Sequence, residues 1–276
     1  MELNLTFLTD NLVDRGAGLK GEHGLSLWLQ KGATRLLFDV GQTGLFLDNA
    51  RLLKVDLSAP YDVVLSHGHY DHGGGLAPLL KASPPRKFIA HPDVFTSKYA
   101  RRAGAAPRFI GLDIKPEVVS NYTELQLASQ SVDLGDGLMT TGVIPREVDF
   151  EPANPEFWTK QEGDWFPDNL YDDQALLAYT PKGLVVILGC AHSGVVNTLQ
   201  HALRITGEKK IYALVGGFHL GGASGARIGQ TVDALRALDI QSIAACHCTG
   251  FQAKAALYSA FGPRFVNVSV GLSLTF

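Results

Sequence analysis

The sequence predicts an α/β protein whose mixed β-sheets are covered by helices. Over the last hundred residues, short apolar runs alternate with apolar residues at helical spacing, which is typical of strand–helix–strand crossovers. The opening third consists of short apolar or alternating runs bounded by glycine and charged residues, as expected for strands. With 276 residues, 46% of them hydrophobic, the chain can bury the core of one large domain or of two modest ones.

The first half of the chain contains clear strands and one unusual segment. We expect a helix at 75–82 and strands at residues 3–9, 25–30, 35–39 and 61–66. Residues 83–130 hold one short apolar run, at 88–90, and otherwise show no clear period. Residues 145–173 combine prolines, aromatic residues and acids without any period, which is typical of a lid or binding loop. A surface insertion without a role is the alternative.

The last hundred residues predict four strands and three helices. The strands are expected at residues 184–188, 211–215, 242–245 and 265–270. Apolar residues three or four positions apart mark two helices, at 196–203 and 228–235, and a third is expected around 252–261.

A metal-binding pattern follows the predicted strand at 61–66. The chain reads Ser66-His67-Gly68-His69-Tyr70-Asp71-His72-Gly73-Gly74, with three imidazoles and one carboxylate within six positions. Imidazole suits zinc, iron and similar ions, and the carboxylate with a further imidazole suggests two ions. His67 and His69 share a face if the strand continues, and the glycines let the backbone turn beyond Asp71 and His72. A polar turn that is merely rich in histidine is the alternative.

Three later predicted strands also end close to a histidine, namely His192, His219 and His247. Ligands of α/β sheets collect outside the carboxyl ends of strands, so these histidines can converge on one edge. We expect His192 and His247 to be metal ligands, because both lie in glycine-flanked turns. His219 could be a ligand, an acid or base, or a substrate contact. For each of them, a hydrogen-bonded structural role is the alternative.

Acidic residues and one further histidine are candidates for supporting roles. Asp39 ends an apolar strand, where a carboxylate is costly to bury unless it is paired. Orienting a ligating imidazole would explain it, and a turn cap at Gly41 is the alternative. Asp172 or Asp173 could reach the metals, although solvated loop acids are more frequent. His23 lies in a loop between early strands and is a candidate pocket residue.

The overall charge and the cysteines restrict the class of protein. A net charge of −3 and a pI near 6.3 give no electrostatic footprint for nucleic acid or an anionic membrane. The first residues lack the pattern of a signal peptide, and no run approaches the ~18 apolar residues of a membrane span. Three cysteines favour a reducing, cytoplasmic compartment. On a strand, Cys246 and Cys248 would point away from His247.

The sequence resembles the metallo-β-lactamase superfamily over nearly its whole length. The resemblance is carried by His-x-His-x-Asp-His with the following glycines, by Asp39 with Gly41, and by the order of the strand-end histidines. It implies a four-layer αββα sandwich formed by a single domain, residues 1–276, with a lid or insertion at 145–173. A dinuclear site would lie along one edge. His67, His69 and a later histidine would hold one ion, and Asp71, His72 and His247 the other.

A narrower resemblance points to the dihydropterin synthase-like branch of this superfamily. It is carried by the motif at 66–72 and by the segments 189–194, 217–220 and 246–250. Members include an archaeal enzyme that joins a dihydropterin-methyl diphosphate to a ribosylaminobenzene phosphate. The sequence departs from the wider superfamily twice. Residues 140–143 lack a frequent histidine, so His192 must supply the third ligand. Cys190 stands where a bridging aspartate is usual, and it could ligate as a thiolate or be a buried thiol.

We therefore expect a metal-dependent hydrolase of a small anionic ester or phosphate compound. Its cofactors would be two divalent ions, with zinc favoured over iron, manganese or magnesium, and no residue is assigned to an organic cofactor. Asp71 would hold its ion and orient the attacking water, and His219 could donate to a substrate oxyanion.

Other functions remain compatible with the same motif. A transferase could join a dihydropterin-methyl diphosphate to an aromatic acceptor, with Trp158, Trp165 and Phe166 stacking on the pterin ring. A ligand sensor could have kept the metals and lost turnover. A nucleic acid or membrane partner is not expected, and the sequence does not indicate the oligomeric state.

Overall fold

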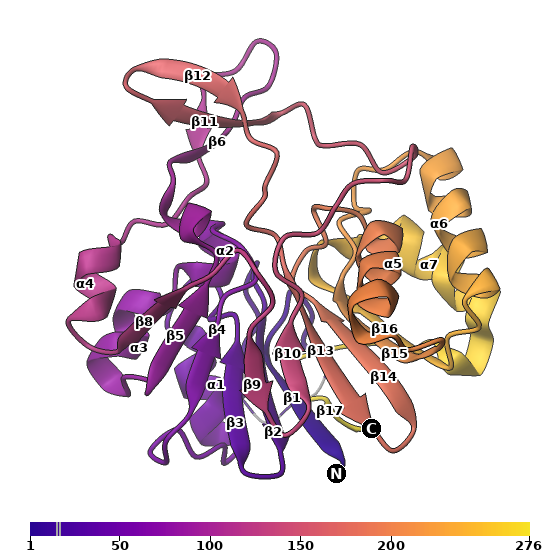
Figure 1. Cartoon of the computed structure of the whole chain (residues 1–276), viewed down its shortest axis with the longest axis horizontal. Coiled ribbons are helices and arrows are strands. Elements are labelled where there is room, and N and C mark those ends of the chain that lie inside the picture. The colour runs from indigo at the N-terminus through magenta and orange to yellow at the C-terminus, as the bar shows by residue number, and fades with distance from the viewer. Residues whose placement is uncertain (15, 17) are drawn as a thin grey trace.

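The computed structural model describes residues 1–14, 16 and 18–276. Two large β-sheets stack face to face, and helices cover the outer side of each, so the fold is a four-layer αββα sandwich (Figure 1). This is the fold class that the sequence predicted. The three buried clusters of apolar side chains correspond to the three spaces between the four layers.

The first sheet has seven strands in the order β17-β1-β2-β3-β4-β5-β8. The pairs β17–β1, β1–β2 and β2–β3 are antiparallel, whereas β3, β4, β5 and β8 run parallel to one another. The strands are β1 (Leu3–Thr9), β2 (Ser26–Lys31), β3 (Thr34–Phe38), β4 (Asp62–Val64), β5 (Lys87–Ala90), β8 (Glu124–Leu127) and β17 (Ser273–Thr275).

The second sheet has six strands in the order β16-β15-β14-β13-β10-β9, with β14, β15 and β16 parallel. The strands are β9 (Asp133–Gly135), β10 (Leu138–Thr140), β13 (Ala175–Thr180), β14 (Gly183–Leu188), β15 (Ile211–Gly217) and β16 (Ser242–Cys246). The expected strand at 265–270 is wrong: this segment contributes a single bridge between Phe265 and Ile243.

The helices are divided between the two outer faces (Figure 1). Those on the first sheet are α1 (Leu45–Leu52), α3 (Leu76–Ala82) and α4 (Pro116–Ser120), and those on the second are α5 (Val195–Thr206), α6 (Gly225–Ala237) and α7 (Phe251–Phe261). Short 3₁₀ turns are η1 (Pro92–Phe95), η2 (His247–Thr249) and η3 (Gly262–Arg264). In the described residues, no helix has the length and apolar character needed to cross a membrane.

The alternation of side chains along β2 explains why the layers stack. Leu27 and Leu29 lie in the core between the two sheets, whereas Trp28 points the other way, into the core beneath the helices. Successive side chains of a strand face opposite sides, so a strand that is apolar on both faces belongs in the middle of such a sandwich.

A small third sheet projects beyond the sandwich on the side of the candidate site (Figure 1). Its order is β12-β11-β6-β7, formed by β6 (Lys98–Ala100), β7 (Arg108–Phe109), β11 (Phe157–Gln161) and β12 (Asp164–Pro167). The expectation that residues 145–173 lack regular structure is therefore wrong, because β11 and β12 lie within this segment. Glu162 and Gly163, both with positive φ, form the two-residue turn of a β-hairpin, whose partner β6 lies far upstream in the sequence.

Candidate metal centre

The candidate site lies at one edge of the sandwich, where strands from both sheets end. From β4 the chain enters the loop 65–69 and then the short helix α2 (Tyr70–Gly73). The parallel strands β14, β15 and β16 end just before Cys190, Phe218 and His247. Since the carboxyl ends of neighbouring parallel strands meet at one edge, side chains far apart in the sequence lie together here.

Three imidazoles form what we call the first donor set: His67, His69 and His192. His67 Nε2 lies 3.0 Å from His69 Nδ1 and 3.1 Å from His192 Nε2. All three side chains are buried, and burial is the largest cause that holds the pKa of each well below the usual value for histidine. They stay neutral at neutral pH, which is the form of imidazole that binds metal.

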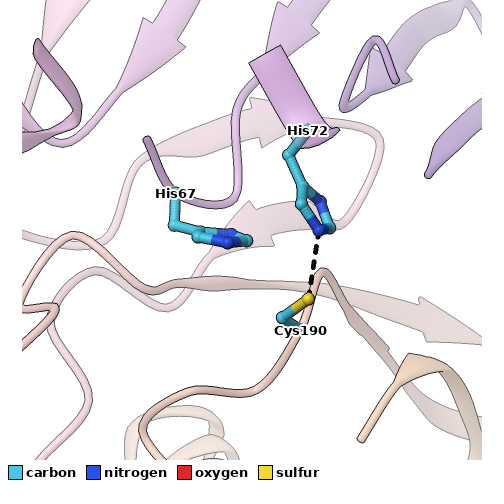
Figure 2. Close-up of side chains that lie close together, drawn as sticks. All are labelled: His67, His72 and Cys190. Carbon is cyan, nitrogen blue, oxygen red and sulfur yellow. Dashed lines mark hydrogen bonds between the residues drawn. The ribbon is translucent and has the colours of Figure 1, made fainter. Parts of the chain in front are cut away.

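A second donor set lies beside the first and has mixed chemistry: Asp71, His72, Cys190 and His247. His72 Nε2 lies 3.1 Å from both Cys190 Sγ and His247 Nε2. Asp71 Oδ2 is 3.4 Å from His247 Nε2. Figure 2 shows the Cys190 thiol pointing toward His72, with the His67 ring beside that of His72. Donor atoms of His67, His72 and Cys190 lie within 4.8 Å of one another, so the Cys190 thiol is close to both donor sets.

Asp39 orients one imidazole of each donor set, as the sequence suggested for it. Its Oδ2 accepts hydrogen bonds from His72 Nδ1 (2.6 Å) and Ser66 Oγ (2.8 Å), and its Oδ1 accepts from the Ser66 amide (2.7 Å). Because the Ser66 hydroxyl donates to Asp39, it accepts from His67 Nδ1 at 2.9 Å. Both rings thus carry hydrogen on Nδ1 and turn the Nε2 lone pair toward the centre.

The carboxylates near the second donor set have strong effects on protonation. Burial would lower the pKa of His72, but the charge and hydrogen bond of Asp39 outweigh it and raise that pKa. Burial would raise the pKa of Asp71, but the hydrogen bond from His23 is the largest of several contacts that hold it well below its usual value. Asp71 is therefore ionised at neutral pH.

Asn11 fixes His247 and His23 together. His247 Nδ1 donates to Asn11 Oδ1 at 2.8 Å, which leaves Nε2 as a lone pair. Asn11 Nδ2 donates to His23 Nδ1 at 3.1 Å, and His23 Nε2 donates to Asp71 Oδ2 at 3.1 Å. His23, the candidate pocket residue, thus acts on the second donor set through Asp71. The role of Asn11 depends on contacts across the fold and has no local signal in the sequence.

Strained backbone surrounds the two donor sets. Asp39, Ala191, His219 and His247 all adopt positive φ, between 47° and 61°, although none is glycine. Such conformations are unfavourable for residues with a Cβ and concentrate at functional sites, where neighbouring contacts hold them.

Asp172 and Asp173 hold the loops that carry the first donor set and are not solvated loop acids. Asp172 Oδ2 accepts from the Gly68 amide at 2.7 Å, between His67 and His69. Asp173 Oδ2 accepts from the Ser193 amide at 2.7 Å, beside His192. Both carboxylates are buried and contact the main chain of these loops.

A buried lysine of the small sheet compensates the charge of Asp172. Lys98 Nζ lies 2.9 Å from Asp172 Oδ1 and 3.1 Å from Asp168 Oδ2, and the lysine side chain is 1% exposed. The ion pair ties β6 to the loop that carries His67 and His69. Gly68 lets the same loop pack closely against η1, because a Cβ there would lie 2.1 Å from the Val94 carbonyl oxygen. Sequence reasoning missed Lys98, since its partners lie more than 60 positions away.

Both donor sets open onto a cavity of about 820 Å³. Its wall includes three arginines, Arg102, Arg108 and Arg227. The Arg108 guanidinium stacks over the Tyr70 ring at 5.5 Å, and Arg102 pairs with Glu156 at 2.9 Å. The cavity is therefore open to solvent, lined by cationic groups, and bounded on one side by the candidate metal ligands.

The β-hairpin of the small sheet places Phe157 over the imidazoles. The Phe157 ring lies 5.2 Å from the His69 ring and 5.3 Å from the His192 ring. Trp158 and Trp165, which the sequence suggested for the pocket, lie on the opposite face of the hairpin, stacked on Arg101. This corrects the expectation, and the reason is the alternation of side chains along β11. Phe166, the third aromatic residue suggested for the pocket, is 47% exposed and is not among the described residues that line the cavity.

His219 lies on the cavity wall next to the first donor set. Its ring centroid is 4.2 Å from that of His192 and 6.0 Å from that of Phe157. Within the described part of the chain, its Nδ1 has no hydrogen-bond partner. The ring can therefore contact a molecule in the cavity.

The arrangement fits two metal ions. In the first donor set, the nitrogen separations of 3.0 and 3.1 Å are close to the roughly 3.3 Å between ligands about 2.0 Å from one tetrahedral ion. In the second set, the Nε2 lone pairs of His72 and His247 face each other at 3.1 Å and need a positive charge between them. Neutral imidazoles, a carboxylate and a thiol are suitable ligands.

Comparisons with known proteins point to one family. A model of the metallo-β-lactamase superfamily matches residues 19–170. The chain is 30% identical over 269 residues to the 7,8-dihydropterin-6-methyl-4-(β-D-ribofuranosyl)-aminobenzene-5'-phosphate synthase of Methanocaldococcus jannaschii, which covers 92% of this chain and 90% of the relative.

Solved structures agree. Tm1679, named a metal-dependent hydrolase of the β-lactamase superfamily, is 30% identical, with a TM-score of 0.83 over 99% of this chain and 98% of that one. Zn²⁺-bound PqqB from Methylobacterium extorquens is 15% identical, with a TM-score of 0.56 over 98% of this chain and 99% of that one, and shares the fold.

Proposed function

The chain belongs to the metallo-β-lactamase superfamily, in the dihydropterin synthase-like branch, and we propose that it is a metal-dependent hydrolase of a small anionic ester or phosphate compound. The observation that carries the proposal is the shared cavity. Its lining includes members of both donor sets together with arginines that attract an anion. A volume of about 820 Å³ suits a small-molecule substrate.

The chemistry of the site divides between metal ions and side chains. Two divalent ions, with zinc favoured, would lower the pKa of a water molecule toward neutrality and neutralise charge on the substrate. Arg108 and Arg227 lie on the cavity wall, where they can bind and orient an anionic substrate. His219, beside His192, can donate a hydrogen bond to a substrate oxygen.

Asp71 is the candidate for orienting the attacking water. It is ionised, it belongs to the second donor set, and its position is fixed by His23. We also propose that the chain forms a single domain. Residues 145–173 act as its lid, because Phe157 from this segment covers the imidazoles. An apolar ring at this position excludes bulk water and strengthens electrostatic interactions beneath it.

The test is turnover of a panel of esters, phosphodiesters and diphosphates by protein loaded with Zn²⁺ or Mn²⁺. His69→Ala removes a ligand of the first donor set and should reduce kcat/KM by more than the roughly 10–100-fold typical of outer-shell partners. The control is His201→Ala, because His201 lies in α5 and bonds the Thr141 carbonyl. Full activity of His69→Ala would rule out the proposed site.

A second candidate, group transfer, is supported by the name of the curated relative, a synthase. The substrate would be a dihydropterin-methyl diphosphate, with an aromatic compound as acceptor in place of water. Release of diphosphate that requires the acceptor supports transfer, and release without it supports hydrolysis. Dihydropterin fluorescence reports binding in either case, and binding without any turnover would indicate a sensor.

A further inference from the structure

Two cysteines from different strand ends meet beside the second donor set. Cys190 follows β14, and Cys248 lies in η2 after β16. Their Sγ atoms and a ring nitrogen of His247 all lie within 4.8 Å of one another. Cys190 is buried, whereas Cys248 is half-buried and lines the cavity. The third cysteine, Cys246, is buried in the core between the sheets.

The backbone after β16 brings Cys248 to the same side as His247. In a continued strand, Cys248 would have faced away from His247, as the sequence suggested. The positive φ of His247 (48°) ends the strand in a 3₁₀ turn, so both side chains line the cavity. The amide of His219 donates to Cys248 Sγ at 3.3 Å, which favours negative charge on that sulfur.

We propose that Cys190 and Cys248 are, together with His247, ligands of the second ion, which they bind as two thiolates and one imidazole. Two sulfurs about 2.3 Å from a tetrahedral ion lie roughly 3.8 Å apart, within the observed limit of 4.8 Å. The contacts of His72 Nε2 with Cys190 and His247, both 3.1 Å, fit the same centre. Asp71 Oδ2, 3.4 Å from His247 Nε2, stays in the same donor set and keeps its contact with His23.

The ligand chemistry determines which ions the site takes. Each thiol loses its proton when it binds the ion, so loading the site releases two protons from the cysteines. Thiolates favour soft or borderline ions, so the site selects Zn²⁺ or Co²⁺ over Mg²⁺. This inference rests on the proposed metal centre but is independent of the reaction proposed for it.

Cobalt substitution tests the two sulfur ligands directly. Metal-free protein loaded with two equivalents of Co²⁺ should show near-ultraviolet sulfur-to-cobalt charge transfer. Cys190→Ser and Cys248→Ser should each lower its intensity by roughly half, since each removes one of two thiolates. Cys246→Ala, the matched control, should leave it unchanged. Full intensity in Cys248→Ser would overturn the proposal.

Alkylation of the wild-type protein provides a test that needs no variant. Iodoacetamide labelling of Cys248, the half-buried thiol, should be suppressed by Zn²⁺ and not by Mg²⁺, as read by peptide mass spectrometry. Equal labelling of Cys248 with and without Zn²⁺ would contradict the inference. Hydrolysis without charge transfer would overturn the thiolate site alone, and charge transfer without turnover of any ester or phosphate would overturn the proposed reaction alone.

Discussion

The first and second donor sets hold their side chains in different ways. The first consists of three neutral imidazoles on two loops, whose main chains are fixed by Asp172 and Asp173. The second is mixed in chemistry, and the charge of Asp39 acts directly on His72. We infer from this difference that the first ion is held by imidazoles on fixed loops. The affinity for the second ion should depend on pH and on the thiolate ligands.

The largest expected effect is a loss of stability when Lys98, the buried partner of Asp168 and Asp172, is replaced. Lys98→Met leaves two carboxylates without their buried cation, so the free energy of unfolding should fall by about 3–5 kcal/mol. Because the Gly68 amide is held by Asp172, the variant should lose the first ion before the second. Urea unfolding and ions per chain by elemental analysis measure both effects.

A double variant separates charge from packing at this position. Adding Asp172→Asn to Lys98→Met removes one of the uncompensated charges and should restore part of the lost stability. No recovery would mean that Lys98 stabilises the protein through packing alone.

The stability of the metal-free protein should depend on pH through Asp173, one of the two loop carboxylates. Burial raises the pKa of Asp173 to about 6, from 3.8, and within the described residues its Oδ1 has no hydrogen-bond partner. The folded state therefore binds the proton more tightly than the unfolded state. The contribution of Asp173 to the free energy of unfolding is fully present below pH 4. It is lost as the pH rises toward 6, by up to about 3 kcal/mol.

Asp173→Asn should abolish this fall. Urea unfolding of metal-free protein between pH 4 and 7 measures it, with the exposed Asp149→Asn as the control. Parallel pH profiles of the wild type and Asp173→Asn would show that Asp173 does not titrate in this range.

A smaller effect is expected when Asp39, which orients one imidazole of each donor set, loses its charge. Asp39→Asn keeps the size of the side chain but removes the charge beside His72, so affinity for the second ion should fall by about 10–100-fold. The first ion should be affected less, because His67 is reached through Ser66. Competition with a chromogenic chelator measures both constants. Equal losses at both positions would contradict the difference between the donor sets.

The sequence predicted what depends on local spacing. The cluster at 66–74 and the strand-end positions of His192, His219 and His247 follow from runs of residues that are short enough to recognise. The four-layer fold followed from the family resemblance and is confirmed. The structure places these histidines together, and their roles as ligands remain predictions.

What the sequence could not predict depends on register and distant contacts. Phe157 and Trp158 are adjacent aromatic residues, and only the pairing of β11 with β6 decides which one faces the cavity. The direction of Cys248 depends on one positive φ at His247. Lys98 and Asp172 meet because β6 packs against a loop 74 positions later, a contact that leaves no local pattern.

The smallest expected effect is the order in which the ions leave on acidification. Asp39 raises the pKa of His72, so below that pKa the second ion must displace a proton from the ring, and its affinity should fall at least tenfold for each pH unit. Burial lowers the pKa values of the first donor set, so protons compete there only at lower pH. Dialysis of loaded protein from pH 8 to pH 5, with ions per chain counted at each step, should pass through a state with one ion. Loss of both ions in a single step would mean that the two donor sets bind as one unit, joined through Cys190.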